Sequence, residues 1–341
     1  MRQLLFAEPG RVVWDEAPDP APGDARAAVV RPLAVARCDL DPIMAQLGIF
    51  PGPFPVGHET VAEVVAVGDE VTDRRPGDVV LVPFQVSCGT CAACAEGRFA
   101  ACSTHRARAG SAFGFGEAGG GHGGAVADLL AVPHADHLLV AAPPGIAPAA
   151  LCTLPDNVID GYRAVGPQLR DRPGADVLVV GGAAASIGLY AVAVAVALGA
   201  ASVRYADTDA DRCAAAEALG AQAILQEGAW PRRFERALIT VENTGDPEGL
   251  ACALRSTEDY GTCTSVAIHF APASMPLLEL YTRGMTFHTS RADSRRFLPE
   301  VVDLVASGRL DPLAIPTTIV PWDRADEAWL EPATKLVVQR D

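Results

Sequence analysis

Basic residues are scarce in this chain of 341 residues. Lys and Arg number 27 against 42 Asp and Glu, which gives a formal net charge of −15. A surplus of negative charge repels the phosphates of nucleic acids and the headgroups of anionic membranes. The charge balance therefore excludes nucleic acid and a membrane surface as expected partners.

We also expect neither a secretory signal nor a membrane span. The stretch Met1 to Glu8 turns acidic before an apolar core of signal-peptide length forms, so we expect the first strand of a cytoplasmic protein. Residues 177–203 carry no charge and are long enough to span a membrane, but Gly181-Gly182 interrupts them. This pattern predicts a buried strand, a turn and a helix. The sequence has neither an internal repeat nor a disordered linker.

The length and the pattern of apolar residues predict two domains with different secondary structure. Half of the residues are hydrophobic, and the length is typical of two domains. Short apolar runs alternate with turn residues in the first part, which indicates an antiparallel, barrel-like domain. These runs lie at 27–30, 60–67, 79–84 and 125–132.

From Asp176 onward, strands alternate with helices, which is typical of a doubly wound parallel sheet. The expected strands are 177–180, 203–206, 223–225, 237–241, 262–268 and 286–289. The expected helices are 187–198, 209–219 and 297–306. We therefore predict an α/β protein with a parallel sheet and a separate antiparallel, β-rich domain.

Four of the nine cysteines lie within fifteen residues: Cys88, Cys91, Cys94 and Cys102. Four thiolates in one loop can close a tetrahedral zinc site with no position left for substrate, so we expect a structural zinc. An iron–sulfur cluster or a disulfide pair is the alternative, although Cys102 precedes Ser103 rather than the proline of the bacterial iron–sulfur run. The scattered cysteines are assigned no chemistry: Cys152, Cys213, Cys252 and Cys263.

A second metal site is indicated by Gly57-His58-Glu59, with Cys38 twenty residues earlier. A lone histidine is usually a core residue, but here an imidazole, a carboxylate and a thiol occur together. A zinc with three protein ligands keeps one position open and acts as a Lewis acid toward a bound hydroxyl. Oxidation of an alcohol requires this chemistry.

With these motifs the chain resembles the zinc-containing medium-chain alcohol dehydrogenases/reductases over nearly its whole length. By motif position the resemblance assigns the catalytic zinc to Cys38, His58 and Asp156, with Cys152, one helical turn earlier, as the alternative third ligand. Glu59 corresponds to the carboxylate that approaches the metal during ligand exchange, or else it accepts a hydrogen bond behind the ligands.

The resemblance also implies an architecture: a GroES-like catalytic domain at 1–150, an NAD-binding Rossmann domain at 151–285, and a return to the catalytic domain at 286–341. It implies two zinc ions per chain, a homodimer or homotetramer, and small alcohols, aldehydes or ketones as substrates. We predict an NAD-dependent zinc dehydrogenase that transfers a hydride between the nicotinamide and a substrate bound to zinc.

Two positions depart from the proton relay of the family. Members that oxidise alcohols often have Ser or Thr two residues after the zinc cysteine and a histidine further on, where this chain has Leu40 and Ile43. Asp39, Asp160 or a chain of waters could carry the proton instead. The loss of the relay keeps two alternatives open: a reductase of conjugated C=C bonds, and a non-catalytic relative that binds zinc or nucleotide.

The cofactor loop lies between the strand at 177–180 and the following helix. Aligned on Gly188, the G-x-G-x-x-G fingerprint reads Ala183-x-Ala185-x-x-Gly188, so two glycines have gained a methyl group. Backbone N–H groups at a helix start still suit a pyrophosphate. The candidate cofactor residues are Gly182, Ala183, Ala185, Ser186, Ile187 and Gly188.

Asp207 lies nineteen residues after Gly188, at the end of the next expected strand. A carboxylate there binds the ribose hydroxyls of NAD and repels a 2′-phosphate, or it has a structural role. Arg212 is the nearby candidate cation, and an ion pair with Asp209 or Asp211 is its alternative role. Leu40, Phe50 and the segment 44–49 are expected to form an apolar wall of the substrate pocket.

Overall fold

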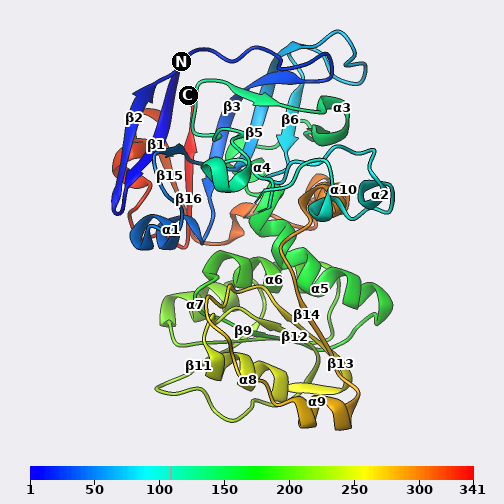
Figure 1. Cartoon of the computed structure of the whole chain (residues 1–341). Helices are drawn as coiled ribbons and strands as arrows, with labels where there is room; N and C mark the ends of the chain where they lie inside the picture. Colours follow the sequence, from blue (N-terminus) through cyan, green and yellow to red (C-terminus); the bar gives the residue numbers. More distant parts are fainter. Residues whose placement is uncertain (108–109) are drawn as a thin grey trace.

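The computed structural model describes residues 1–107 and 110–341 and shows two lobes joined by a narrower waist (Figure 1). Both ends of the chain, blue and red in the figure, build one lobe, and the middle of the chain builds the other. Across the described residues, none of the helices combines the length and the apolarity that crossing a bilayer requires.

The first lobe is built on a seven-stranded sheet in the order β15-β16-β3-β5-β6-β8, with β7 also paired to β3. Neighbours are antiparallel except β15 and β16. Its strands are β3 (Ala28–Arg37), β5 (Glu59–Val67), β6 (Val79–Val82), β7 (Leu130–Val132), β8 (Val140–Ala141), β15 (Thr317–Pro321) and β16 (Lys335–Gln339). A small sheet beside it contains β1 (Arg2–Glu8), β2 (Arg11–Glu16) and β4 (Phe54–Pro55).

The second lobe contains a parallel sheet in the order β11-β10-β9-β12-β13-β14. Its strands are β9 (Val177–Val180), β10 (Val203–Asp207), β11 (Gln222–Leu225), β12 (Ala237–Glu242), β13 (Thr257–Ser265) and β14 (Thr286–Thr289). Its helices are α5 (Ile159–Asp171), α6 (Ala185–Ala197), α7 (Ala210–Ala218), α8 (Pro247–Arg255) and α9 (Leu277–Arg283). β14 begins directly after the predicted domain boundary at residue 285 and still pairs with β13.

The uncharged stretch 177–203 folds as β9, α6 and the first residue of β10, and all of β9 and most of α6 are buried. The remaining helices are α1 (Asp41–Leu47), α2 (Ala92–Ala95), α3 (Ala135–Leu138), α4 (Pro148–Leu151), α10 (Ser294–Ala306) and α11 (Ala325–Ala328). A π-helical turn, Leu154–Val158, connects the lobes between α4 and α5.

Two expected strands are placed differently. Of 125–132, only Leu130–Val132 is a strand, because the amides of Ala125 and Val126 bond to the carbonyls of Gly57 and Val56 at the sharp turn before β5. The strand expected at 262–268 instead runs from Thr257 to Ser265 as β13.

Candidate active site

Three chain segments bring the predicted zinc ligands together. Cys38 follows β3 directly, and His58 and Glu59 stand at the start of its antiparallel partner β5, where Ala36 pairs with Glu59. Asp156 projects from the π-helical turn at the waist. Ligand atoms of Cys38, His58, Glu59 and Asp156 all lie within 4.8 Å of one another, and all four residues are buried.

This donor set fits a zinc ion. It offers a thiol, an imidazole and carboxylates, which are the groups that zinc accepts in catalytic sites. The imidazole Nε2 of His58 lies 3.3 Å from Oδ2 of Asp156, so both atoms face the same point. The Cys152 thiol instead donates to the carbonyl of Ala149 and lies outside the group.

The protonation of the metal-free site follows from burial and charge. Burial pulls the pKa of His58 down, but the carboxylates of Asp41 and Asp156 outweigh it and raise this pKa to about 9. Burial, reinforced by Asp156, raises the pKa of the Cys38 thiol well above its ordinary value. Without metal, the site therefore holds an imidazolium and a neutral thiol, and zinc must displace both protons to bind.

Asp41 is a residue of the site that the sequence analysis missed. Its Oδ2 accepts from the amide of Cys38 at 3.3 Å, and its Oδ1 lies 3.9 Å from Nδ1 of His58. Among the described residues, that buried nitrogen has no hydrogen-bond partner. A histidine that binds zinc through Nε2 presents its other N–H to such a carboxylate, so Asp41 is placed to orient His58. Its position three residues after Cys38 could have indicated this role.

Lys335 was also missed, and it is the only lysine of the sequence. Its Nζ donates to both carboxylate oxygens of Glu59 at 2.8 Å and to the carbonyl of Arg37 at 2.9 Å. Both charged side chains are fully buried. The pair holds Glu59 beside the zinc ligands with its charge neutralised. No sequence motif connects two residues that lie 276 positions apart.

The cofactor loop runs from β9 into α6 and presents its amides to the waist. Asp39 from the other lobe accepts from the amides of Ser186 and Ile187 at 2.9 and 3.3 Å and from the Ser186 hydroxyl at 2.8 Å. Gly182 has a φ of 155°, and an added Cβ would lie 2.6 Å from Cα of Thr244. The candidate residues Ala183, Ala185 and Gly188 belong to the same turn and first helical turn.

Asp207 ends β10 beside this loop, where its Oδ2 would lie 2.3 Å from a Cβ at Gly181. Its carboxylate is buried and accepts from Arg212 Nε and Nη2 at 2.8 and 2.7 Å, from the Tyr205 hydroxyl at 2.6 Å, and from the Asp209 amide at 3.0 Å. Arg212 also pairs with Asp209. To bind the Asp207 carboxylate, the hydroxyls of a cofactor ribose would have to replace some of these hydrogen-bond donors.

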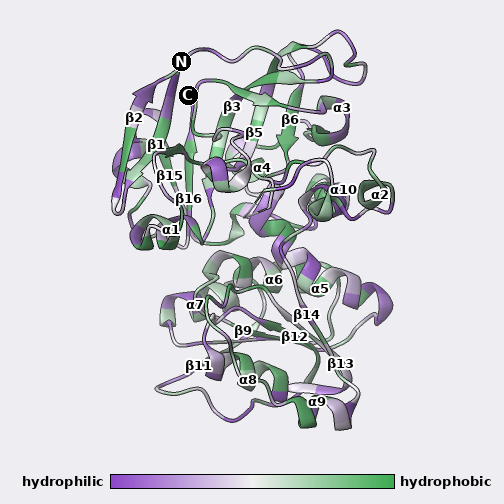
Figure 2. Ribbon diagram, viewed as in Figure 1, coloured by the Kyte–Doolittle hydropathy of each residue, from purple (hydrophilic) through white to green (hydrophobic). Residues whose placement is uncertain are grey.

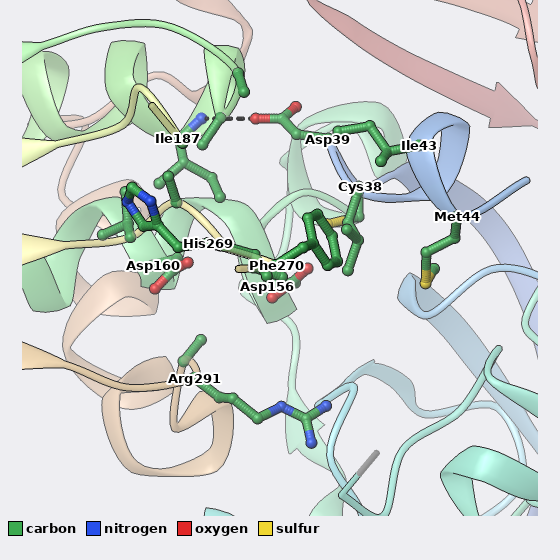
Figure 3. A pocket seen from close by; sticks show the side chains of 18 of the residues that line it. Cys38, Asp39, Ile43, Met44, Asp156, Asp160, Ile187, His269, Phe270 and Arg291 are labelled. Atoms are coloured by element: carbon green, nitrogen blue, oxygen red, sulfur yellow. Dashed lines mark hydrogen bonds between the residues drawn. The ribbon is translucent and has the colours of Figure 1, made fainter. Parts of the chain in front are cut away.

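A cavity of about 710 Å³ opens between the lobes over the metal ligands (Figure 3). Leu40 and Ile43, the two departures from the family relay, line it together with Met44 and Phe50 as an apolar wall. Phe115 stacks on His58 with ring centres 4.9 Å apart. The charged and polar lining residues beyond the metal ligands are Asp39, Asp160, His269, Thr289, Ser290 and Arg291.

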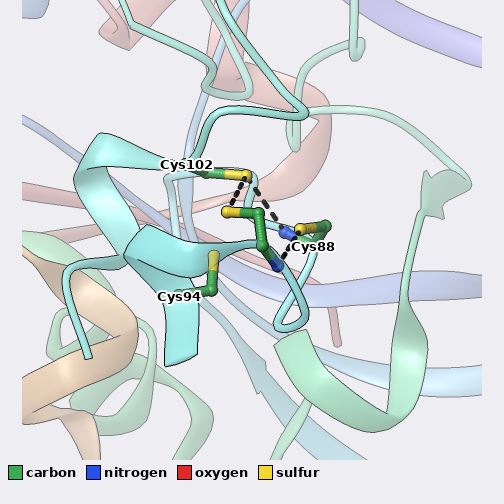
Figure 4. A group of neighbouring side chains, drawn as sticks. Cys88, Cys94 and Cys102 are labelled. Atoms are coloured by element: carbon green, nitrogen blue, oxygen red, sulfur yellow. Dashed lines mark hydrogen bonds between the residues drawn. The ribbon is translucent and has the colours of Figure 1, made fainter. Parts of the chain in front are cut away.

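The four clustered cysteines surround a second point in the first lobe (Figure 4). Their sulfurs lie within 4.8 Å of one another, and Cys91 and Cys102 are 3.9 Å apart, close to the ~3.8 Å that tetrahedral Zn–S bonds require. Hydrogen bonds from Ser103 lower the pKa of the Cys91 thiol to about 5. The loop therefore stabilises a thiolate before metal binds.

Comparison with known proteins agrees with this geometry. Residues 24–144 match the family described as alcohol dehydrogenase GroES-like domain, and residues 186–307 match the family described as zinc-binding dehydrogenase. A probable zinc-binding alcohol dehydrogenase of Mycobacterium tuberculosis is 31% identical over 96% of this chain and 84% of its own length. The chain belongs to the zinc-binding alcohol dehydrogenase family.

Other members of this medium-chain dehydrogenase/reductase family are similarly related. A D-altritol 5-dehydrogenase of Agrobacterium fabrum is 31% identical over 91% of this chain and 90% of its own. The structure of an alcohol dehydrogenase from Thermus sp. ATN1 covers all of both chains with a TM-score of 0.89 and 29% identity. The protein is a zinc-dependent oxidoreductase of the alcohol dehydrogenase type with a nicotinamide cofactor, and its α/β fold joins a GroES-like to a Rossmann domain.

Proposed function

We propose that this dehydrogenase uses NAD to interconvert an alcohol and its carbonyl compound at the Cys38, His58 and Asp156 site. The convergence of these three side chains in a cavity between the lobes carries the proposal. When bound, zinc supplies Lewis acidity that favours the ionised hydroxyl, and the nicotinamide supplies or accepts the hydride.

The protein residues divide the remaining tasks. Cys38, His58 and Asp156 hold the metal, and Asp41 orients the imidazole of His58. Glu59, neutralised by Lys335, stands close enough to approach the metal when ligands exchange. Phe115 and the wall formed by Leu40, Ile43 and Met44 keep water away from the reacting carbon.

The proton of the alcohol needs another path, because Leu40 and Ile43 cannot carry it. Asp160 lines the cavity, and burial raises its pKa to about 6 even though Arg163 pairs with it. A carboxylate with a pKa near neutrality can exchange a proton with solvent that reaches the cavity. Asp160 is therefore our candidate for the group that passes the proton to solvent. Asp39, the other carboxylate considered, is occupied by its hydrogen bonds to the cofactor loop.

The preference for NAD over NADP rests on Asp207. Its carboxylate stands at the end of β10 beside the cofactor loop, where a 2′-phosphate would meet negative charge. The bidentate contact with Arg212 offsets part of that charge. Dissociation constants of NADH and NADPH, measured by nicotinamide fluorescence, test this preference. Tighter binding of NADPH would overturn it.

We further propose two zinc ions per chain: one at the catalytic site, and a structural one held by Cys88, Cys91, Cys94 and Cys102. Metal analysis of the purified protein tests the count. A homodimer or homotetramer is proposed from exposed side chains on α9, which precedes the edge strand β14 and is labelled in Figure 2. These side chains are Leu277, Leu278 and Tyr281. Light scattering measures the assembly.

The two alternative functions are less well supported. The comparisons favour a zinc-dependent dehydrogenase over a conjugated-bond reductase, and relatives include a D-altritol 5-dehydrogenase. A substrate screen with zinc-loaded protein, read at the nicotinamide absorbance, tests the proposal directly. Reduction of enones without oxidation of any alcohol would reverse it, and binding without turnover would favour a non-catalytic relative.

A further inference from the structure

One side chain at the waist contacts both the metal ligands and the start of α6. Asn157 follows the zinc ligand Asp156 in the π-helical turn and is fully buried. The sequence analysis assigned it no role. A buried amide needs partners for its two N–H donors and for its oxygen, so the neighbours of Asn157 show what it does.

Four buried groups surround this amide. Two can donate: Nζ of Lys335 lies 3.0 Å from it, and Oγ of Ser186 lies 2.7 Å from it. Two accept: Oε1 of Glu59 at 3.1 Å and Oδ2 of Asp156 at 3.0 Å. The neighbours of an asparagine decide which end is the oxygen, so Oδ1 faces the two donors and Nδ2 donates to the two carboxylates. The opposite orientation would place the oxygen of Asn157 against both carboxylates.

The hydrogen bond from Asn157 orients a zinc ligand. Oδ2 of Asp156, which accepts it, is also the oxygen that lies 3.3 Å from Nε2 of His58. A group that hydrogen-bonds a metal ligand fixes the orientation of that ligand, and its loss typically lowers metal affinity by about ten- to a hundredfold. Asn157 is therefore placed to hold Asp156 toward the metal.

The hydroxyl of Ser186 has one hydrogen and two acceptors. Oδ1 of Asp39 lies 2.8 Å from its Oγ, and Oδ1 of Asn157 lies 2.7 Å from it. A hydroxyl donates one hydrogen bond, and an ionised carboxylate is the stronger acceptor, so Asp39 takes the hydrogen while it stays at the cofactor loop. The oxygen of Asn157 then faces a lone pair of the hydroxyl and accepts from Lys335 instead.

Asp39 also occupies the amides where we expect the cofactor pyrophosphate. It accepts from the amides of Ser186 and Ile187 at 2.9 and 3.3 Å, and Figure 3 shows the contact with Ile187. A phosphate that binds these amides has to take the place of the carboxylate. The Ser186 hydroxyl then loses its first acceptor, and Asn157 remains within hydrogen-bond distance.

We propose that Asn157 is a positioning residue that links the metal site to the cofactor loop. Its Nδ2 holds Asp156 in the orientation that binds zinc, and its Oδ1 accepts the Ser186 hydroxyl once a phosphate has taken the place of Asp39. This inference rests on the proposed zinc site and cofactor loop. Because coupling between two sites is reciprocal, zinc and cofactor should each strengthen the binding of the other.

The decisive experiment measures the binding of ADP-ribose by calorimetry, on zinc-loaded and on metal-free protein. ADP-ribose carries the pyrophosphate but lacks the nicotinamide ring, so contact of that ring with the metal cannot produce a difference. We expect ADP-ribose to bind roughly three- to tenfold more tightly to the zinc-loaded form, which is the effect of about one hydrogen bond. The measurement requires no turnover.

Two variants test the path between the sites. Ser186→Ala removes the hydroxyl, and Asn157→Leu removes the amide at a similar side-chain size. In both variants the ratio of the two affinities should fall to about one. In Asn157→Leu, chelator competition should also show that zinc binds the catalytic site about ten- to a hundredfold more weakly. Ser186→Ala still tests the link if Asn157→Leu fails to fold.

Thr153→Val is the matched control, because Thr153 is fully buried just before the π-helical turn and its hydroxyl donates to the carbonyl of Ala150. This variant should keep the wild-type ratio. The structural zinc is removed from every metal-free variant alike, so its loss cannot make the ratios differ.

A purely structural role of Asn157 would weaken ADP-ribose binding to both forms equally. An unchanged ratio in the two test variants would therefore overturn the inference. Equal binding to both forms of the wild type would overturn it as well, because the Ser186 hydroxyl would then stay with the phosphate. Either result leaves the dehydrogenase function intact, whereas a lack of any ADP-ribose binding would contradict both the link and the proposed cofactor loop.

Discussion

The carboxylate of Asp39 accepts three hydrogen bonds from Ser186 and Ile187 at the start of α6. These amides are the donors expected to bind the cofactor pyrophosphate. An anion from the first lobe thus lies where we expect an anion of the cofactor to bind. If the cofactor binds these amides as proposed, it has to displace Asp39, whose contact with Ser186 and Ile187 otherwise joins the two lobes.

Replacing Asp39 with Asn should change affinity and stability in opposite directions. The amide keeps the shape but removes the competing charge, so we expect NADH to bind about three- to tenfold more tightly. The loss of an anion from the helix start should lower the melting temperature of the cofactor-free protein. Fluorescence titration and calorimetry measure the two effects.

Asp171→Asn serves as the control, because Asp171 is an exposed carboxylate at the C-terminal end of α5 and, among the described residues, has no hydrogen bond with the start of α6. This variant should change neither the affinity for NADH nor the melting temperature appreciably. NADH affinity that stays the same or weakens in Asp39→Asn would show that the carboxylate does not compete with the cofactor.

Lys335→Met should destabilise the protein by about 3–5 kcal/mol, because it leaves the buried charge of Glu59 without a partner. The double variant Lys335→Met, Glu59→Gln should recover part of this loss. Urea unfolding measures both. A single substitution that costs as little as a surface change would mean that Glu59 is already neutral in the folded protein.

Zinc affinity of the catalytic site should fall as the pH falls. Without metal, His58 has a pKa of about 9 and the pKa of Cys38 is raised, so zinc displaces up to two protons at neutral pH. We expect the affinity to drop about ten- to a hundredfold per pH unit below 8. Competition with a chelator at several pH values measures the slope.

Asp41→Asn should make this slope shallower, because the Asp41 carboxylate is a main reason for the raised pKa of His58. Zinc binding that is independent of pH in the wild type would contradict the assigned ligands.

Cys91→Ser should remove one of two zinc ions and leave the other. We expect the zinc content to fall from two ions to one per chain, with a loss of thermal stability, since the four sulfurs of the loop 88–102 converge on the one point where the proposed structural zinc would bind. Cys213→Ala, at a buried cysteine outside both clusters, should keep both ions. Full zinc content in Cys91→Ser would exclude the structural site.

Much of this protein follows from local sequence patterns. The alternation of strands and helices after Asp176 predicted the parallel sheet, because each strand there is apolar and each helix is bounded by its own turn residues. The four clustered cysteines predicted a loop that binds metal, because four thiols that can serve as ligands lie within fifteen residues. The strand predicted at 125–132 was wrong in its first part. There the amide of Ala125 bonds to the carbonyl of Gly57, which lies in the turn before β5.

Other features depend on contacts that no local pattern encodes. The pairing of Lys335 with Glu59 requires β16 to return beside β3, and the contact of Asp39 with Ser186 requires the two lobes to meet. The sequence by itself determined which chemical groups are available, since a metal or a cofactor selects residue types at short spacings. Only the tertiary structure decided which charges face each other, because electrostatic energy depends on distance in space and on burial rather than on separation along the chain.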